Sequence, residues 1–222
     1  MRVTLIFLAV LLGISLAWIV RQTINVRPWV AETPGPSAPD HLPAAVTAAR
    51  LGLAVLLAVV TSFFMLGTSA YFMRMEMGRD WIPLAVPGIL WANTLVLVFA
   101  SFALQRAWNA ARRWNMDKLR PALLAGGACT VVFIAGQAVA WGQLQSAGHF
   151  LTGNPATSFF YLLTSLHALH LLGGLAAWMR TMVRVRRGDA PYKIRVSVEL
   201  CAVYWHFLLL LWLGLFGLLL YN

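Results

Sequence analysis

Two histidines stand three residues apart in one long apolar run, and a third lies in the last such run of the chain. His167 and His170 belong to SFFYLLTSLHALHLLGG, and His206 belongs to VYWHFLLLLWLGLF. Imidazoles in such positions can ligate a haem iron, relay protons or hydrogen-bond a neighbouring helix. If both runs cross a membrane about 30 Å thick, His170 lies about 18 Å below one surface and His206 lies about 9 Å from the opposite surface. The two side chains are therefore at similar depths in the membrane. A haem held by this pair is therefore geometrically possible, although we favour hydrogen bonds to neighbouring helices.

Other residues with chemical potential are few. Of the seven acids, only Glu199 lies at the edge of an apolar run, and the others fall between runs. A pump or transporter normally carries ionisable groups within its spans, so a small transporter is only a minor alternative. Cys129 and Cys201 form no closely spaced pair, which disfavours a disulfide framework or a thiolate metal site. We expect no catalytic residue, cofactor site or metal site in this chain.

The composition sets the class of protein that must position these side chains. The 222 residues are 60% hydrophobic and only 11% charged, with a mean hydropathy of +0.75. One soluble core cannot hide that much apolar surface. We therefore predict an all-α, polytopic integral membrane helix bundle. The runs long enough to span about 30 Å of hydrocarbon are Val3–Val20, Leu51–Phe72, Val86–Leu104, Pro121–Trp141, Ser158–Met179 and Leu200–Tyr221.

The distribution of basic residues gives an orientation. If all six runs cross, 14 of the 17 lysines and arginines fall in the loops after the first, third and fifth. The positive-inside rule then places those loops in the cytoplasm and both termini outside. A cleaved signal at Val3–Val20 would break this parity, so we keep that run as a span. The formal net charge of +10 fits basic loops at an anionic inner leaflet, and no nucleic acid is expected as a partner.

A proline-rich segment divides the chain. RPWVAETPGPSAPDHLPAA follows the first run, and its prolines forbid a continuous helix there. We predict an N-terminal helix and cytoplasmic loop over residues 1–50, and a five-helix domain over residues 51–222.

The last two runs resemble the final helices of cytochrome c oxidase subunit III, the third core subunit of haem-copper oxidases. The residues that carry this resemblance are Phe159, Phe160, Thr164, His167, His170, Gly173, Gly174, Glu199, Tyr204, Trp205, His206, Phe207 and Trp212. LGLAVLLAVVTSFFMLGTSAYF is similar to the first helix common to the family. Two further helices are similar through Leu90, Trp91, Asn93, Thr94, Gln105 and Arg106, and through Gln137 and Trp141. Residues 51–222 are covered, and Val3–Val20 lies outside this five-helix match.

Three departures from the family stand out. Where its members usually carry buried carboxylates, this sequence has Val60, Ala140 and Leu209. The family's carboxylate in its first common helix is associated with support of proton uptake. Its absence at Val60 indicates a divergent member.

The resemblance implies a non-catalytic subunit of a haem-copper terminal oxidase. Such a subunit packs beside the catalytic subunit and other oxidase subunits, binds phospholipid between its helices, and supports proton uptake and stability during aerobic electron transport. Haem and copper are then expected in the catalytic subunit and none in this chain. The residues expected to pack the helices or line a lipid cleft are His167, His170, Glu199, Tyr204, Trp205, His206, Trp212, Gln137, Trp141 and Asn93.

Two alternatives to an oxidase subunit stay open at this point. One is a subunit associated with a nitric oxide reductase, and the other is a membrane cytochrome that binds haem through His170 and His206. All of these functions require a multi-pass membrane protein, and we expect this chain to lie in the cell inner (plasma) membrane.

Overall fold

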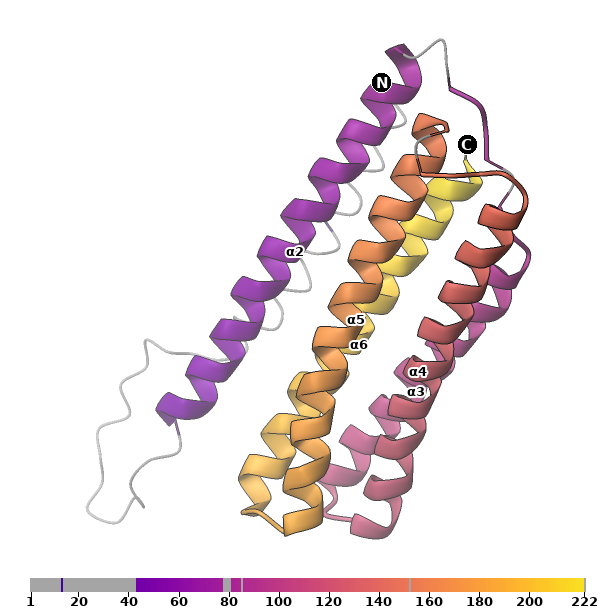
Figure 1. The fold of residues 1–222 in the computed structure, drawn as a ribbon. Helices are drawn as coiled ribbons and strands as arrows, with labels where there is room; N and C mark the ends of the chain where they lie inside the picture. Colours follow the sequence, from indigo (N-terminus) through magenta and orange to yellow (C-terminus); the bar gives the residue numbers. More distant parts are fainter. Residues whose placement is uncertain (1–12, 14–42, 78–80, 85, 152, 222) are drawn as a thin grey trace. The chain divides into compact units, whose positions relative to one another are not determined.

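A computed structural model describes residues 13, 43–77, 81–84, 86–151 and 153–221, and the regular structure in these ranges is helical (Figure 1). Five helices are long and apolar enough to cross a membrane, which confirms the predicted all-α membrane protein. They are α2 (Pro43–Met77), α3 (Ile89–Arg112), α4 (Met116–Ser146), α5 (Pro155–Arg187) and α6 (Pro191–Leu220). The predicted first span, Val3–Val20, lies outside the described residues except for Gly13.

The chain forms two compact units, residues 1–66 and residues 67–222, and α2 runs from one into the other. In the described part of the first unit, α2 is apolar, and two of its hydroxyl groups are hydrogen-bonded within the helix. The hydroxyls of Thr61 and Ser62 donate to the carbonyls of Leu57 and Ala58, at 2.7 Å and 2.9 Å. Such internal bonds let a polar side chain sit in a membrane helix.

In the second unit, α3 to α6 form a four-helix bundle in which sequence neighbours pack side by side. α3 packs against α4 and α6, and α5 packs against α4 and α6, so the four helices close into a ring (Figure 1). Short turns join α3 to α4 and α5 to α6, as expected for antiparallel neighbours. The large side chains that fill the centre of this ring include Trp205, Trp212 and Phe133, and all three are fully buried.

Local sequence signals set the ends of the helices. Asn115 caps α4 by accepting a hydrogen bond from the Lys118 N–H (3.1 Å), and Asn154 caps α5 by accepting one from the Ala156 N–H (3.2 Å). Pro155 and Pro191 occupy the first helical positions of α5 and α6, where a missing N–H costs nothing. Gly188 ends α5 with φ 70°, a left-handed conformation that glycine adopts without steric cost.

The observed helices differ in length from the predicted spans. All five extend beyond the apolar runs at one end or both, because helices continue past the hydrocarbon layer until a capping residue or a turn stops them. α4 begins at Met116 rather than at Pro121, and Pro121 lies inside it at the cost of one backbone hydrogen bond. α3 begins at Ile89 rather than at Val86, since Pro87 and Gly88 come first.

At the end of the bundle opposite the α3–α4 and α5–α6 turns, the segment before α3 is anchored to the beginning of α5. The Asn154 side chain donates to the carbonyl of Ile82 at 2.5 Å and accepts from its N–H at 3.4 Å. Tyr71 packs edge-on against Trp81 and Phe159, with ring centroids 4.9 Å and 5.6 Å away. These contacts fix the C-terminal part of α2 within the second unit.

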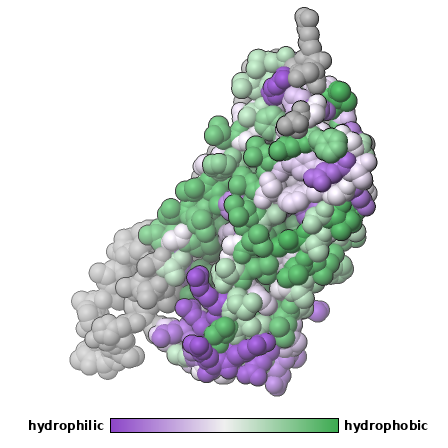
Figure 2. All heavy atoms as spheres, viewed as in Figure 1, coloured by the Kyte–Doolittle hydropathy of each residue, from purple (hydrophilic) through white to green (hydrophobic). Residues whose placement is uncertain are grey.

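The α3–α4 and α5–α6 turns lie at the same end of the bundle. Figure 2 shows hydrophilic surface at this end, smaller hydrophilic areas toward the other end, and mostly apolar surface between them. The structure thus brings together two of the three basic loops that the charge count assigns to one side of the membrane.

Candidate functional site

The candidate functional residues lie mostly in the centre of the four-helix bundle. Asn93, Gln137, His167, Tyr204, Trp205 and Trp212 are buried, while Trp141, His170, Glu199 and His206 are partly exposed. None of these ten residues lies in the wall of the large groove between α3 and α4. They are therefore best understood through the contacts they make between helices.

His206 joins α6 to α3. Its Nε2–H donates to the Gln105 side-chain oxygen at 2.8 Å, and its Nδ1 is hydrogen-bonded to the Ser101 hydroxyl. Because the amide oxygen only accepts, Nδ1 of a neutral ring accepts from the hydroxyl. Both ring nitrogens of His206 are thus engaged by α3, which leaves neither one directed at α5.

His167 is fully buried and lies in an aromatic cluster. Its ring centroid is 5.2 Å from that of Trp212 and 5.9 Å from that of Phe133, and the Phe133 and Trp212 rings meet edge to face at 4.9 Å. The cluster joins α4, α5 and α6. Geometries of this kind stabilise beyond the apolar area they bury.

His170 lies one turn from His167 on α5, and its backbone takes part in the α5–α6 contact. Its Nδ1 is 2.8 Å from the Leu166 carbonyl of the same helix. The Tyr204 hydroxyl donates to the backbone carbonyl of His170 at 3.1 Å. Gly174 permits this close approach, since a Cβ there would lie 2.9 Å from the Tyr204 ring. Since α3 engages both ring nitrogens of His206, the described contacts do not favour a haem held by His170 and His206.

One arrangement recurs three times in the bundle: an indole N–H donates to a threonine hydroxyl on another helix. Trp205 donates to Thr130 (2.8 Å), Trp212 to Thr94 (2.9 Å), and Trp141 to Thr164 (3.1 Å). Each threonine hydroxyl in turn donates to the carbonyl four residues earlier in its own helix. The three pairs link α6 to α4, α6 to α3 and α4 to α5, so each of these three indole N–H groups has a partner on another helix.

Thr130 and Ser101 were not singled out by the sequence pattern. Both are isolated hydroxyl residues in otherwise apolar runs. Polar side chains in membrane helices tend to bond across helices, and this was the signal that could have identified them.

Glu199 and Arg184 lie near the α5–α6 turn. Glu199 is partly exposed on α6. The Arg184 guanidinium donates to the Ser197 hydroxyl at 2.5 Å, and Thr181 and Cys201 are hydrogen-bonded at 3.3 Å. These contacts tie α5 to α6 at the basic end of the bundle.

The three positions that lack carboxylates fall in different surroundings. Ala140 is fully buried in α4, Leu209 is partly exposed in α6, and Val60 lies in α2 in the other unit. In the described ranges no three or more His, Cys, Asp or Glu side chains gather closely enough to hold a metal ion.

A double-mutant cycle on the His206 contact is expected to show coupling between α3 and α6. We predict that His206→Phe and Gln105→Met together lower the free energy of unfolding by about 0.5–1.5 kcal/mol less than the sum of the single changes, because they share one hydrogen bond. Thermal unfolding of the purified chain in detergent measures this. Additive effects would show that the two side chains do not interact.

Gln137 gives a prediction of the opposite sign. Its side chain is 1% exposed, and neither amide atom has a hydrogen-bonding partner among the described residues. Gln137→Met keeps the length of the side chain and removes the unpaired polar atoms, so we expect a gain of about 1–2 kcal/mol in the free energy of unfolding. The control is Gln145→Met on the exposed surface of the same helix, which should change stability by less than about 0.5 kcal/mol. A loss of stability in Gln137→Met alone would show that the amide is bonded in the folded protein.

Comparison with known proteins gives a consistent result. A chain described as a probable cytochrome c oxidase subunit 3 of Mycobacterium tuberculosis is 31% identical over 159 residues, which cover 69% of this chain and 78% of that protein. Cytochrome c oxidase subunit 3 of Synechocystis sp. is 30% identical over 171 residues, with 73% and 71% covered. The protein of that name from Thermostichus vulcanus is 30% identical over 176 residues, with 76% and 85% covered.

The family described as cytochrome c oxidase subunit III matches residues 5–222. This match begins well before Leu51, so it extends the five-helix resemblance to include the predicted first span. By this match and by relatives that are 30% identical or more, the chain is a member of the cytochrome c oxidase subunit III family.

Proposed function

We propose that this chain is the non-catalytic third subunit of a haem-copper terminal oxidase and that it supports the catalytic subunit during aerobic electron transport. The observation that carries the proposal is the family match over residues 5–222. The geometry of the bundle supports it, because the tryptophans and His206 at its centre hydrogen-bond to neighbouring helices. A side chain occupied in this way holds helices together rather than performing chemistry.

The partners in this proposal are the catalytic subunit, which carries the haem and copper, the other oxidase subunits, and phospholipids. Apolar side chains on the outside of α3 offer a surface for either a neighbouring subunit or lipid; they are Trp91, Leu95, Phe99 and Phe102. Their spacing of four, four and three residues places them along one stripe of the helix. No cofactor is assigned to this chain.

Support of proton uptake is the part of the proposed role most affected by the departures in sequence. Neither Val60 nor the buried Ala140 can titrate. In this member, the subunit supports proton uptake by stabilising the catalytic subunit and not through a carboxylate in these helices. We also propose that the chain is divided into an N-terminal helix and loop, residues 1–50, and a five-helix domain, residues 51–222.

We place the protein in the cell inner (plasma) membrane with both termini outside. The basic α3–α4 and α5–α6 turns lie together at one end of the bundle (Figure 1), and such ends face the cytoplasm under the positive-inside rule. The C-terminal end of α6 is then on the outer side. The N-terminal end follows if Val3–Val20 crosses the membrane.

The experiment that tests the proposal is mild detergent purification of the tagged chain from its native membrane, with mass spectrometry and an absorption spectrum of the product. We expect a large catalytic subunit to co-purify, together with its haem spectrum. A chain that purifies alone without colour would contradict the assignment to an oxidase. A chain that purifies alone with a haem spectrum that His206→Ala abolishes would replace it with the cytochrome function.

A further inference from the structure

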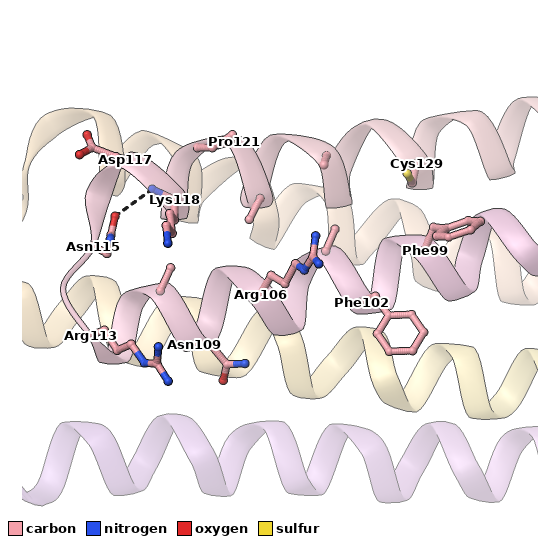
Figure 3. A pocket seen from close by; sticks show the side chains of 14 residues that line it. Phe99, Phe102, Arg106, Asn109, Arg113, Asn115, Asp117, Lys118, Pro121 and Cys129 are labelled. Atoms are coloured by element: carbon pink, nitrogen blue, oxygen red, sulfur yellow. Dashed lines mark hydrogen bonds between the residues drawn. The ribbon is translucent and has the colours of Figure 1, made fainter.

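A large groove follows the outer side of the α3–α4 seam, within the second unit. Its volume is about 1050 Å³, and both helices line it from the middle of the bundle to their connecting turn (Figure 3). Along α3 it extends from Phe99 to Arg113, a length of about 21 Å at 1.5 Å per residue. None of the sequence-predicted site residues lines it.

Small side chains create the groove. Ala103 and Ala110 of α3 face Ala122 and Ala125 of α4 along its walls. Beneath the walls the two helices pack closely, since a Cβ at Gly126 would lie 2.7 Å from the Leu104 side chain. The helices therefore meet along their inner faces, while the outer side of the seam is left hollow.

The two ends of the groove differ in character. Toward the middle of the bundle it is lined by Phe99, Phe102 and Cys129, and at the turn by Asn109, Arg113, Asn115 and Lys118. A long cavity that is apolar at one end and polar at the other matches an amphiphile lying parallel to the helices.

Three basic side chains give the polar end a positive charge. Arg106, Arg113 and Lys118 line it and are exposed, and no described carboxylate forms an ion pair with them. Figure 3 shows Arg106 and Lys118 extending into the space between the helices, whereas Asp117 points away from them. Asp117 lies in the first turn of α4, where the helix dipole favours a negative charge.

The depth of the charged end suits a lipid headgroup. Arg106 lies six residues before the end of α3, about 9 Å from that end. A long arginine side chain can reach from such a depth to the membrane surface. Trp114 is exposed in the turn itself, and Trp108 packs under Arg112 at 5.2 Å. Tryptophans of this kind mark the membrane–water interface.

We propose that the groove binds one anionic diacyl phospholipid, with its phosphate among Arg106, Arg113 and Lys118 and an acyl chain between Phe102 and Ala125. A free phosphate ion would occupy only the polar end and would leave the apolar end, lined by Phe99, Phe102 and Cys129, without a partner. The assignment deepens the lipid-binding part of the proposed function and rests on it only for its physiological role.

The test uses the full chain, purified and delipidated in detergent, and titrated with phosphatidylglycerol while native mass spectrometry counts bound lipid. One phosphatidylglycerol per chain is expected to bind at least tenfold more tightly than phosphatidylcholine. The triple change Arg106→Gln, Arg113→Gln and Lys118→Gln should weaken phosphatidylglycerol binding at least tenfold, since each basic residue near an anionic headgroup is worth about fivefold. The matched control, Arg180→Gln with Arg186→Gln and Arg187→Gln, removes three exposed basic residues from α5 and should change binding by less than about threefold.

A second variant keeps every charge and fills the groove. Ala122→Phe with Ala125→Phe should also weaken phosphatidylglycerol binding at least tenfold, and it separates a seated lipid from a general attraction to positive charge. Equal binding of the two lipids, an equal loss in the α5 control, or normal binding to the filled groove would each overturn the proposal. Full displacement of the lipid by inorganic phosphate would do so as well, in favour of a simple anion site. Because the isolated chain is used, failure here is distinguishable from failure to associate with a catalytic subunit.

Discussion

Replacing Trp212 with alanine is expected to lower the midpoint of thermal unfolding of the purified chain by about 10 °C or more. Trp212 has 0% exposure, and its ring contacts Phe133, His167 and Phe216. Removal of a buried aromatic side chain typically costs 3–5 kcal/mol, because the cavity that remains does not collapse fully. The indole also donates to Thr94, so the change leaves a buried hydroxyl without its donor.

Two further variants separate the contributions of Trp212. Trp212→Phe removes the N–H but keeps most of the ring, so it should lose less stability than Trp212→Ala. Trp91→Ala is the matched control, since Trp91 is 58% exposed on α3 and touches only the edge of the cluster through Phe216. If Trp91→Ala and Trp212→Ala lowered the unfolding midpoint equally, Trp212 would not lie at the centre of the bundle.

Gly127→Ala is expected to lower the free energy of unfolding by about 1–3 kcal/mol, the usual cost of overpacking. A Cβ at Gly127 would lie 2.3 Å from the Trp178 ring. That ring is held on α4 by its N–H, which donates to the Leu123 carbonyl at 2.8 Å. The added methyl group must therefore displace the tryptophan, break this hydrogen bond or separate α4 from α5.

Gly142→Ala provides the control on the same helix. Nothing lies within 4 Å of a Cβ at Gly142, and alanine favours the helix over glycine by up to about 1 kcal/mol. We expect this variant to be as stable as the unchanged chain or more so. Chemical or thermal unfolding in detergent measures both variants, and a loss at Gly142 equal to that at Gly127 would show that glycine matters in α4 for a reason other than the contact with Trp178.

The two predictions concern the same physical feature of the bundle. Small residues let the helices approach, and tryptophans then reach from one helix to a threonine or a carbonyl on another. In lipid there is no hydrophobic drive between apolar helices, so close packing and interhelical hydrogen bonds carry the association. The structure places both kinds of contact in the ring of α3 to α6.

These contacts also bear on assembly of the proposed oxidase. A subunit that fails to pack its own bundle cannot present a fixed surface to a partner. Trp212→Ala should therefore reduce co-purification of the catalytic subunit, whereas Trp91→Ala changes the exposed surface of α3 and removes one ring contact with the core, that to Phe216. Loss of the partner in Trp91→Ala at unchanged stability would place the interface on α3.

The amino-acid sequence by itself determined the class of protein and the number of helices in residues 51–222. Twenty-residue apolar runs have few alternatives to spanning helices, because lipid satisfies no backbone hydrogen bond. The order of motifs around His167, His206 and Trp141 was enough to indicate the family, which the match over residues 5–222 confirms. The bounds of the helices were less predictable, since caps such as Asn115 lie beyond the apolar runs.

Only the tertiary structure decided what the polar residues contact. Sequence placed His170 and His206 at similar depths, and that left a haem possible. The rotation of α6 about its axis turns the His206 ring toward Ser101 and Gln105 of α3, and depth along a helix contains no information about that rotation. The α3–α4 groove was hidden for the same reason: alanines spaced along two helices make a hollow only when the helices meet on their other faces. Hydropathy fixes how far along the membrane normal a residue lies, whereas side-chain packing between helices fixes which neighbour it faces.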